Sequence, residues 1–223
     1  MLAEWLAPLT LDELERAYLH RFALALPHSA RSALAVLDWA VLDEVLRAEP
    51  PPNTIVCAKG AGLPLPAPRD LDELRAYMRM GIGVCLRRTE RCHPRLAALA
   101  AGFERALPGI VQIQIFVTPG RTHGFGWHYD AEDVFIAQTA GSKDYYFRPN
   151  TVEADAPFPP PDFNRYHAET SALQTALLVA GDFLYIPARW WHMAVSREDS
   201  LSISVGVVPT CRARLRMPPS RPL

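Results

Sequence analysis

Two histidines and one aspartate have the types and spacing of a metal site. His128 and Asp130 flank Tyr129, and His192 lies much later in an apolar stretch. Side chains two positions apart on a strand point to the same face, so His128 and Asp130 would reach one ion from a single strand. With His192 from a distant strand, they would form a facial triad that leaves about three positions open on an octahedral ion. Non-haem Fe(II) oxygenases use this layout, so the sequence predicts an iron site.

The segments around these side chains have the pattern of short, half-buried strands. Apolar and polar residues alternate along Gly109–Thr118, and Pro119-Gly120 then turns the chain. Short strands joined by Gly, Pro and Asp turns are typical of a double-stranded β-helix, the jelly roll of cupin proteins. We therefore expect a mainly β fold with helical N-terminal additions. The expected strands after the first one are 134–138, 143–147, 177–182, 183–187 and 201–206.

The first hundred residues are predicted to be mostly helical. The capping-box sequence Thr10–Glu13 would open a helix from Leu11 to about Leu26, and Asp70 would cap another. We expect one structural domain with three parts. These are a helical region with a few strands packed on the barrel (1–108), the jelly-roll core (109–208) and a short basic, proline-rich tail (209–223). Further helices are expected at 30–47 and 93–107, and strands at 53–58 and 81–86.

The ligand-bearing segments together resemble the JmjC/cupin-type Fe(II)- and 2-oxoglutarate-dependent oxygenases, most nearly the ribosomal-oxygenase-like branch. The resemblance covers about residues 110–208 and implies that His128, Asp130 and His192 are the catalytic iron ligands. It also implies 2-oxoglutarate and O2 as co-substrates. The residues that carry the resemblance are Thr118-Pro-Gly120, His128-Tyr-Asp130, Val134-Phe-Ile-Ala-Gln138, Gly141-Ser-Lys143, Gly181-Asp-Phe-Leu-Tyr-Ile-Pro187, His192 and Ser202-Ile-Ser-Val-Gly206.

By the same resemblance, Lys143 takes the position of the basic residue that pairs with the distal carboxylate of 2-oxoglutarate. A carboxylate inside a barrel would need such a fixed positive charge. Alternatively, Lys143 is a solvent-exposed lysine in a turn, and Arg148 or Arg189 binds the distal carboxylate. Some family members have Thr three residues before the first ligand, but this chain has Phe125 there, so the assisting hydroxyl must come from elsewhere. The candidates are Thr118, Tyr145, Ser202 and Ser204.

The substrate is expected to enter at a barrel mouth formed by three segments, namely 120–127, the proline-rich 156–161 and 189–191. The proline-rich segment is either a lid or a plain surface excursion. Aromatic area and one positive charge would suit an extended peptide or an acidic small molecule. Gln138 either packs inside the barrel or points at the substrate. At least one of Trp190 and Trp191 is expected to pack over the hydrophobic core. The candidate substrate residues are Trp127, Gln138, Arg189 and Trp190.

Composition excludes several classes of protein. The formal net charge is −1 over 223 residues, which gives no basic footprint for nucleic acid. No apolar run approaches the ~18 residues of a membrane span, and the N-terminus lacks a secretory pattern. The four cysteines have no framework spacing, and Cys92-His93 has no second pair, so we expect reduced thiols, a structural His93 and a cytoplasmic protein.

The predicted activity is hydroxylation of a C–H bond, on a peptide or protein side chain, by O2 and 2-oxoglutarate. Two alternatives stay open: a hydroxylase of a small molecule or natural product, and a non-catalytic metal-binding cupin module, which Lys143 disfavours. The ribosomal-oxygenase-like proteins continue into a helical dimerisation region and a winged-helix domain. We expect this chain to lack both, which favours a free peptide or small protein as substrate and leaves a homodimer open. The basic tail with Arg212, Arg214, Arg216 and Arg221 is expected to be a solvated end.

Overall fold

The computed structural model describes residues 2–152 and 166–208. The proline-rich segment 156–161 and the basic tail 209–223 therefore lie outside the described residues. The strands are β1 (Leu24–Leu26), β2 (Asn53–Ala58), β3 (Ala61–Gly62), β4 (Gly83–Arg87), β5 (Ile110–Thr118), β6 (Asp133–Ala140), β7 (Lys143–Arg148), β8 (Gln174–Leu178), β9 (Phe183–Ile186), β10 (Trp191–Ser196) and β11 (Ser200–Val208). The α-helices are α1 (Leu2–Trp5), α2 (Leu11–Glu13), α3 (Trp39–Leu46), α4 (Leu71–Arg79) and α5 (Pro94–Ala106).

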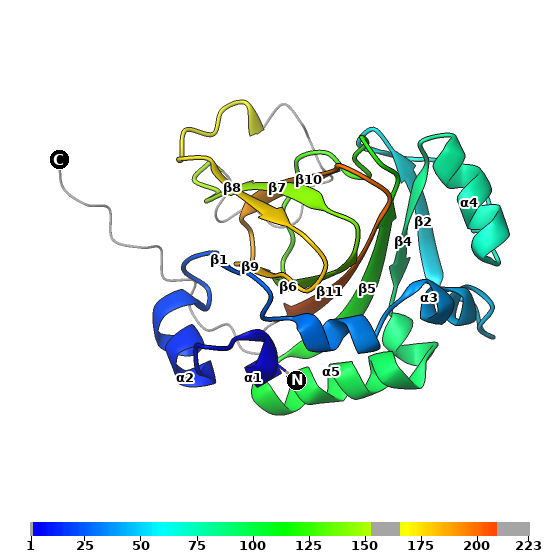
Figure 1. Ribbon diagram of the computed structural model, residues 1–223. Helices are drawn as coiled ribbons and strands as arrows, with labels where there is room; N and C mark the ends of the chain where they lie inside the picture. The colour runs from blue at the N-terminus through cyan, green and yellow to red at the C-terminus, as the bar shows by residue number, and fades with distance from the viewer. Residues whose placement is uncertain (1, 153–165, 209–223) are drawn as a thin grey trace.

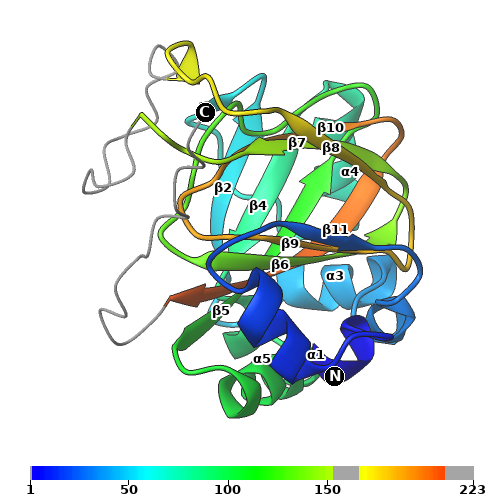
Figure 2. The same cartoon turned by 90° about the vertical axis from the view of Figure 1, so that its left-hand side faces the viewer.

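Two antiparallel sheets face each other, as the jelly-roll expectation requires (Figure 1). The larger sheet has the order β1-β9-β6-β11-β5-β4-β2-β3, and the smaller one has the order β10-β7-β8. Helices cover the outer face of the larger sheet, on the side away from the smaller sheet (Figures 1 and 2). The predicted fold class is therefore confirmed. The strands β1 to β4 belong to the same sheet as the barrel strands, so the predicted boundary at residue 108 does not divide the sheet.

Strand alternation decides which side chains face the helices and which face the space between the sheets. On β5, Ile113, Ile115 and Val117 are fully or almost fully buried in the helix-covered core. Gln114 and Phe116, between them, line the interior of the barrel. The predicted alternation along this segment is confirmed, and it supplies both an apolar core and a polar interior from one strand.

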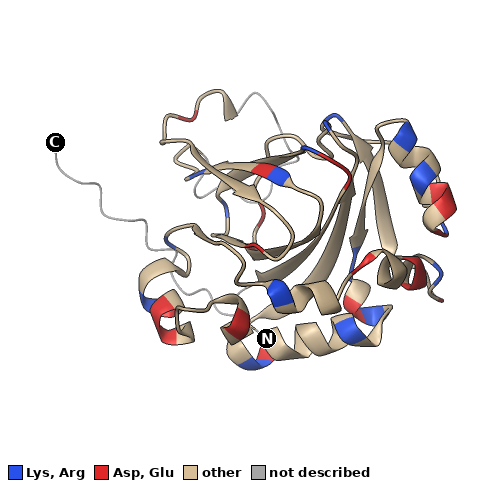
Figure 3. Ribbon diagram, viewed as in Figure 1, with Lys and Arg blue, Asp and Glu red and all other residues tan. Residues whose placement is uncertain are grey.

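The helix-side core is held by aromatic contacts between distant parts of the chain. Trp5 in α1 meets Phe103 in α5 edge-on with ring centroids 5.5 Å apart, and Phe103 meets Phe135 in β6 at 5.3 Å. All three side chains are fully buried. Charged residues concentrate on the helices, whereas the barrel strands carry few (Figure 3). Among the described residues, no helix has the length and apolar character needed to cross a membrane.

The N-terminal helix is shorter than predicted. The Thr10–Glu13 capping box is present, but α2 passes into a π-helical turn that ends at Tyr18. His20 then adopts a left-handed backbone with φ of 60°, and the chain pairs with β9 as β1. The prediction of a helix to about Leu26 was wrong because pairing with a distant sheet edge outweighs local helix propensity there.

The second predicted helix, over 30–47, is interrupted. A 3-10 helix over Arg31–Ala35 precedes α3, which starts after Asp38. The Asp38 side chain accepts a hydrogen bond from the Val41 amide at 2.8 Å, so Asp38 begins a new helix instead of continuing an old one. The helices predicted after Asp70 and from His93 are present as α4 and α5, and the strands predicted at 53–58 and 81–86 as β2 and β4.

Candidate metal centre

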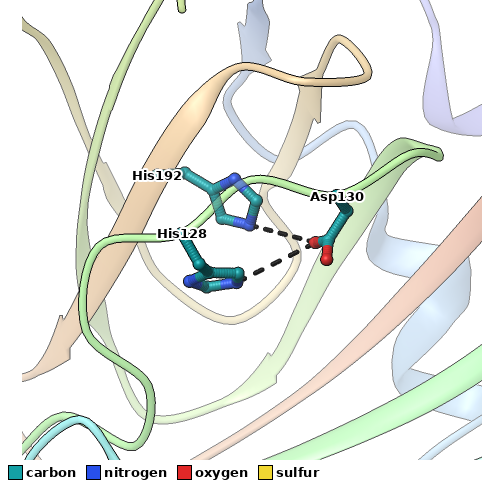
Figure 4. A group of neighbouring side chains, drawn as sticks. All are labelled: His128, Asp130 and His192. Carbon is teal, nitrogen blue, oxygen red and sulfur yellow. Dashed lines mark ion pairs between the residues drawn. The ribbon is translucent and has the colours of Figure 1, made fainter. Parts of the chain in front are cut away.

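The loop between β5 and β6 brings His128 and Asp130 next to His192 on β10 (Figure 4). His128 and His192 form an isolated antiparallel bridge. The His128 amide donates to the His192 carbonyl at 3.1 Å, and the His192 amide donates to the His128 carbonyl at 2.8 Å. The prediction that His128 and Asp130 share a regular strand was wrong, because among the described residues this segment forms isolated bridges and no strand ladder.

The three side chains converge on one point. His192 Nε2 lies 3.5 Å from Asp130 Oδ2, and His128 Nε2 lies 3.9 Å from the same oxygen. One candidate ligand atom from each residue lies within 4.8 Å of the others. This spacing is wide enough for a metal ion between them and too wide for strong hydrogen bonds.

Backbone carbonyls fix which nitrogen of each ring faces the cluster. His128 Nδ1 lies 2.7 Å from the Gly126 carbonyl oxygen, and His192 Nδ1 lies 3.0 Å from the Trp190 carbonyl oxygen. A carbonyl oxygen only accepts, so each Nδ1 carries the proton and each Nε2 keeps its lone pair for the cluster. Carbonyl-oriented imidazoles are common at metal sites, and two imidazoles with one carboxylate suit Fe(II).

The local electrostatics favour the ligating charge state at Asp130 and His128, whereas at His192 burial is outweighed by the adjacent Asp130 carboxylate, which raises the pKa of that imidazole. Burial opposes ionisation of Asp130, but the adjacent His192 and His128 side chains outweigh it and hold the pKa of its carboxyl at about 2. Burial lowers the pKa of His128, and the neighbouring His192 lowers it further. Asp130 is therefore ionised and His128 neutral at ordinary pH, which are the ligating forms.

An inner cavity of about 70 Å³ opens on one side of the three residues. Lys143 and all four predicted hydroxyl candidates line it, namely Thr118, Tyr145, Ser202 and Ser204. Lys143 is only 3 % exposed, and its Nζ donates to Ser202 Oγ at 3.1 Å. Burial lowers the pKa of Lys143 to about 7. The structure, over the residues it describes, records no ion pair between Lys143 and a carboxylate, so this lysine is placed to receive an anion.

The solvated-turn alternative for Lys143 does not fit its burial. Arg148 is engaged elsewhere, because its guanidinium hydrogen-bonds with Ser171 and Tyr166. Phe125 stands as part of the cavity wall, with its ring centroid 5.8 Å from that of His128.

An outer cavity of about 440 Å³ adjoins the inner one and is more open to solvent. The two cavities share a wall that includes His128 and Asp130, so the cluster lies at their junction. Sequence analysis missed two charged residues of the outer cavity, Arg87 and Glu132. Burial, followed by the charge of Asp130, raises the pKa of Glu132 to about 7. The sequence feature that could have pointed to Glu132 was its position two residues after the predicted ligand Asp130.

The predicted substrate residues lie outside the walls of both cavities. The Trp127 ring stacks on the Tyr166 ring with centroids 4.0 Å apart. Trp190 packs in a hydrophobic cluster with Val134, Phe147 and Leu184. The Arg189 guanidinium lies 5.5 Å from the centre of the Tyr129 ring, and its amide donates to the Asp130 carbonyl. Of the predicted mouth, the segment 120–127 contributes Phe125 to the outer cavity, residues 189–191 line neither cavity, and 156–161 lies outside the described residues.

Burial and hydrogen bonding bear on the role of Gln138, which the sequence left open, and on the structural role expected for His93. Gln138 is fully buried, and its Nε2 donates to the Ala140 carbonyl at 2.7 Å, which fits the packing alternative. His93 begins α5, where its Nδ1 accepts from the Arg95 amide at 3.2 Å. Its Nε2 lies 3.0 Å from a carboxylate oxygen of Glu44, so His93 has the structural role predicted for it.

Comparisons with known proteins agree with the fold. A family model described as JmjC domain matches residues 89–215. The "Bifunctional lysine-specific demethylase and histidyl-hydroxylase NO66" of Dictyostelium discoideum is 35% identical over 100 residues, which are 44% of this chain and 19% of that protein. "Jumonji C domain-containing protein 5" of Drosophila melanogaster is 32% identical over 113 residues, covering 44% of this chain and 28% of that protein.

Solved structures of YcfD from Escherichia coli, one of which is described as a ribosomal oxygenase, have the same fold. One superimposes with a TM-score of 0.68 at 18% identity, covering 92% of this chain and 54% of that one. Another, in complex with cobalt and 2-oxoglutarate, gives a TM-score of 0.64 at 21% identity and covers 90% of this chain and 52% of that one. This chain thus spans about half the length of the solved proteins and less than a third of the two curated relatives.

Proposed function

The chain belongs to the JmjC domain family, and from that premise we propose that it is an Fe(II)- and 2-oxoglutarate-dependent oxygenase that hydroxylates a C–H bond on a peptide or protein side chain. One observation carries the proposal. The His128, Asp130 and His192 cluster lies where a small inner cavity with a buried lysine meets a larger, more open one. Such an arrangement gives the co-substrate and the substrate separate access to a shared ion.

The relatives support a protein or peptide substrate. The name of the Dictyostelium discoideum relative includes histidyl-hydroxylase, and the Escherichia coli neighbour is described as a ribosomal oxygenase. One structure of the latter contains cobalt with 2-oxoglutarate, which supports the same co-substrate here. When bound, Fe(II) and 2-oxoglutarate would supply the electrons that activate O2 for hydroxylation.

The residues of the chain supply binding and orientation. His128 Nε2, His192 Nε2 and a carboxylate oxygen of Asp130 would hold the metal. Lys143 Nζ would bind the distal carboxylate of 2-oxoglutarate, and the Ser202 hydroxyl next to it would assist.

Two aromatic side chains would keep water from the junction of the cavities. Phe116 and Phe125 line both cavities, with their rings edge to face and their centroids 6.1 Å apart. A dry site strengthens electrostatic interactions within it. The open side of the outer cavity would admit the substrate.

An anaerobic titration tests this proposal. Protein that contains Fe(II) should develop a weak visible charge-transfer band when 2-oxoglutarate is added, and Asp130→Ala should not. In air, incubation with peptides from the native cell extract should add one oxygen atom to a specific peptide and form succinate. Tight metal binding without the band in the wild-type protein would point to a metal-binding module instead of an oxygenase.

A further inference from the structure

Four aromatic side chains lie close to the metal-binding residues without lining either cavity. Trp127 and Tyr129 flank the ligand His128 in the chain, and Trp191 directly precedes the ligand on β10. The fourth, Tyr166, comes from a distant segment and contacts two of the others. The proposed oxygenase chemistry gives Tyr166 no task, so its contacts with this group need another explanation.

Tyr166 stacks on Trp127. Their ring planes are inclined by only 10°, with centroids 4.0 Å apart. Tyr166 also meets Trp191 edge to face at 5.8 Å, and Trp191 meets Tyr129 in the same way at 4.8 Å. A stacked pair fixes the rotamers of both side chains, because either ring loses its contact area if it turns. Tyr166 therefore holds Trp127 in one orientation.

Trp127 lies in the part of the metal-binding loop that needs such an anchor. Backbone bridges hold the loop at two points, where Phe125 pairs with Gly60 and where His128 pairs with β10. Gly126 and Trp127 lie between these points. Within residues 2–152 and 166–208, the structure records no backbone–backbone hydrogen bond at either of them. The stack with Tyr166 thus supplies a fixed point between the two bridges.

This part of the loop sets the orientation of His128. The carbonyl oxygen that lies 2.7 Å from His128 Nδ1 belongs to the peptide group that joins Gly126 to Trp127. A fixed Trp127 therefore fixes the direction of that carbonyl. The carbonyl in turn determines how the imidazole presents its Nε2 to the cluster (Figure 4).

Tyr166 is itself attached to β7 through Arg148. Arg148 Nη1 donates to the Tyr166 hydroxyl at 3.3 Å, and its guanidinium carbon lies 5.4 Å from the centre of the Tyr166 ring. The same guanidinium donates to Ser171 Oγ and to the Glu169 carbonyl, both at 3.1 Å. The Glu169 side chain accepts from the amide and the hydroxyl of Thr151, each at 2.6 Å. Tyr166 is therefore fixed independently of the metal-binding loop.

We infer that Tyr166 is a positioning residue for the metal centre: by stacking on Trp127 it fixes the orientation of His128 and so tightens binding of the ion. The inference rests on the proposed function, because it requires an ion that His128 binds. A ligand held in place by surrounding packing and hydrogen bonds loses less freedom when the metal binds.

Co(II) is a suitable probe, because its visible absorption bands depend on the arrangement of its ligands. Tyr166→Leu keeps apolar bulk but loses the ring, so it should weaken Co(II) binding to the metal-free protein about tenfold and change the bands. Tyr166→Phe keeps the ring and should restore both the affinity and the bands of the wild-type protein. Tyr77→Leu, which removes a hydrogen-bonded tyrosine from α4, is the matched control and should change neither.

A double variant tests whether Tyr166 acts through Trp127. Trp127→Leu alone should also weaken Co(II) binding. Adding Tyr166→Leu to Trp127→Leu should then cost little further affinity, because the stack is already lost, whereas independent effects would multiply. Melting temperatures of the metal-free variants separate this role from a general effect on stability, which would leave the Co(II) bands unchanged.

Two results would overturn this inference. One is wild-type Co(II) affinity and bands in Tyr166→Leu, and the other is multiplied losses in the double variant. Both leave the proposed function standing, because the wild-type protein still binds the ion. A wild-type protein that binds no Co(II) would instead refute the metal site on which the proposed function depends.

Discussion

His128 and His192 exchange two backbone hydrogen bonds, at 3.1 and 2.8 Å, although they are far apart in the sequence. This reciprocal pair attaches the loop between β5 and β6 to β10. It uses only backbone atoms, so it does not depend on the imidazole rings. The geometry of the metal-binding loop and the ability to bind metal are therefore separable by mutation.

His128→Ala and His192→Ala should each abolish metal uptake and turnover while leaving thermal unfolding nearly unchanged. The backbone pair survives either substitution, and each ring loses only its own contacts. Metal content after anaerobic loading and the melting temperature of the metal-free protein would check this. His28→Ala, which changes a largely exposed histidine, is the control. Full activity in His192→Ala would refute the ligand assignment.

Lys143→Met should weaken 2-oxoglutarate binding and stabilise the protein. Burial lowers the pKa of Lys143 to about 7 from 10.5. Between these values the unfolded chain binds a proton that the folded protein does not, so stability rises with pH across this window. Removing the amine should add on the order of 1–3 kcal/mol to the free energy of unfolding at neutral pH.

The apparent KM for 2-oxoglutarate of Lys143→Met should rise by about 10- to 100-fold, the loss of one charge-assisted bond. Urea unfolding and initial-rate kinetics would measure the two effects. If Lys143 had only a structural role, Lys143→Met would instead lower the stability of the protein and leave the KM for 2-oxoglutarate unchanged.

Ser202→Ala should raise the apparent KM for 2-oxoglutarate by about 3- to 10-fold, which corresponds to one neutral hydrogen bond. The hydroxyl accepts from Lys143 Nζ at 3.1 Å, so it lies where the carboxylate would bind. Ser204→Ala removes the neighbouring inward hydroxyl of β11, for which the structure shows no contact with Lys143 among the described residues. A larger effect from Ser204→Ala than from Ser202→Ala would move the assisting role to Ser204.

His20→Gln should destabilise the protein more at low pH than at high pH. The side-chain hydrogen bond to Asp133 raises the pKa of His20 from 6.5, and the Nδ1–Oδ2 distance is 2.7 Å. The folded protein binds this proton more tightly, so the stabilisation is complete below pH 6.5 and is lost as pH rises through the folded-state pKa. Urea unfolding of both proteins at about pH 6 and about pH 9 would show the difference shrinking. A constant difference would mean that His20 contributes through packing alone.

The sequence by itself was sufficient for features that depend on local periodicity. The alternation in 109–118 predicted which side chains of β5 enter the core, and the cap at Asp70 predicted the start of α4. Strand period and helix capping depend on only a few neighbouring residues, so they can be inferred from the sequence without knowledge of the partner strands. The spacing of His128 and Asp130 does not belong to this class, because the two residues lie in a loop that is bridged to His192 and not in a regular strand.

The tertiary structure decided the features that depend on register between distant segments. Residues 24–26 became a strand because the edge of β9 was available to them. Glu132 is held by Gln114 on one strand and given space by Gly206 on another, a relationship that only the alignment of β5, β6 and β11 creates. A side chain's burial and partners are set by residues far along the chain, so the local pattern around Glu132 could not reveal the cavity that it lines.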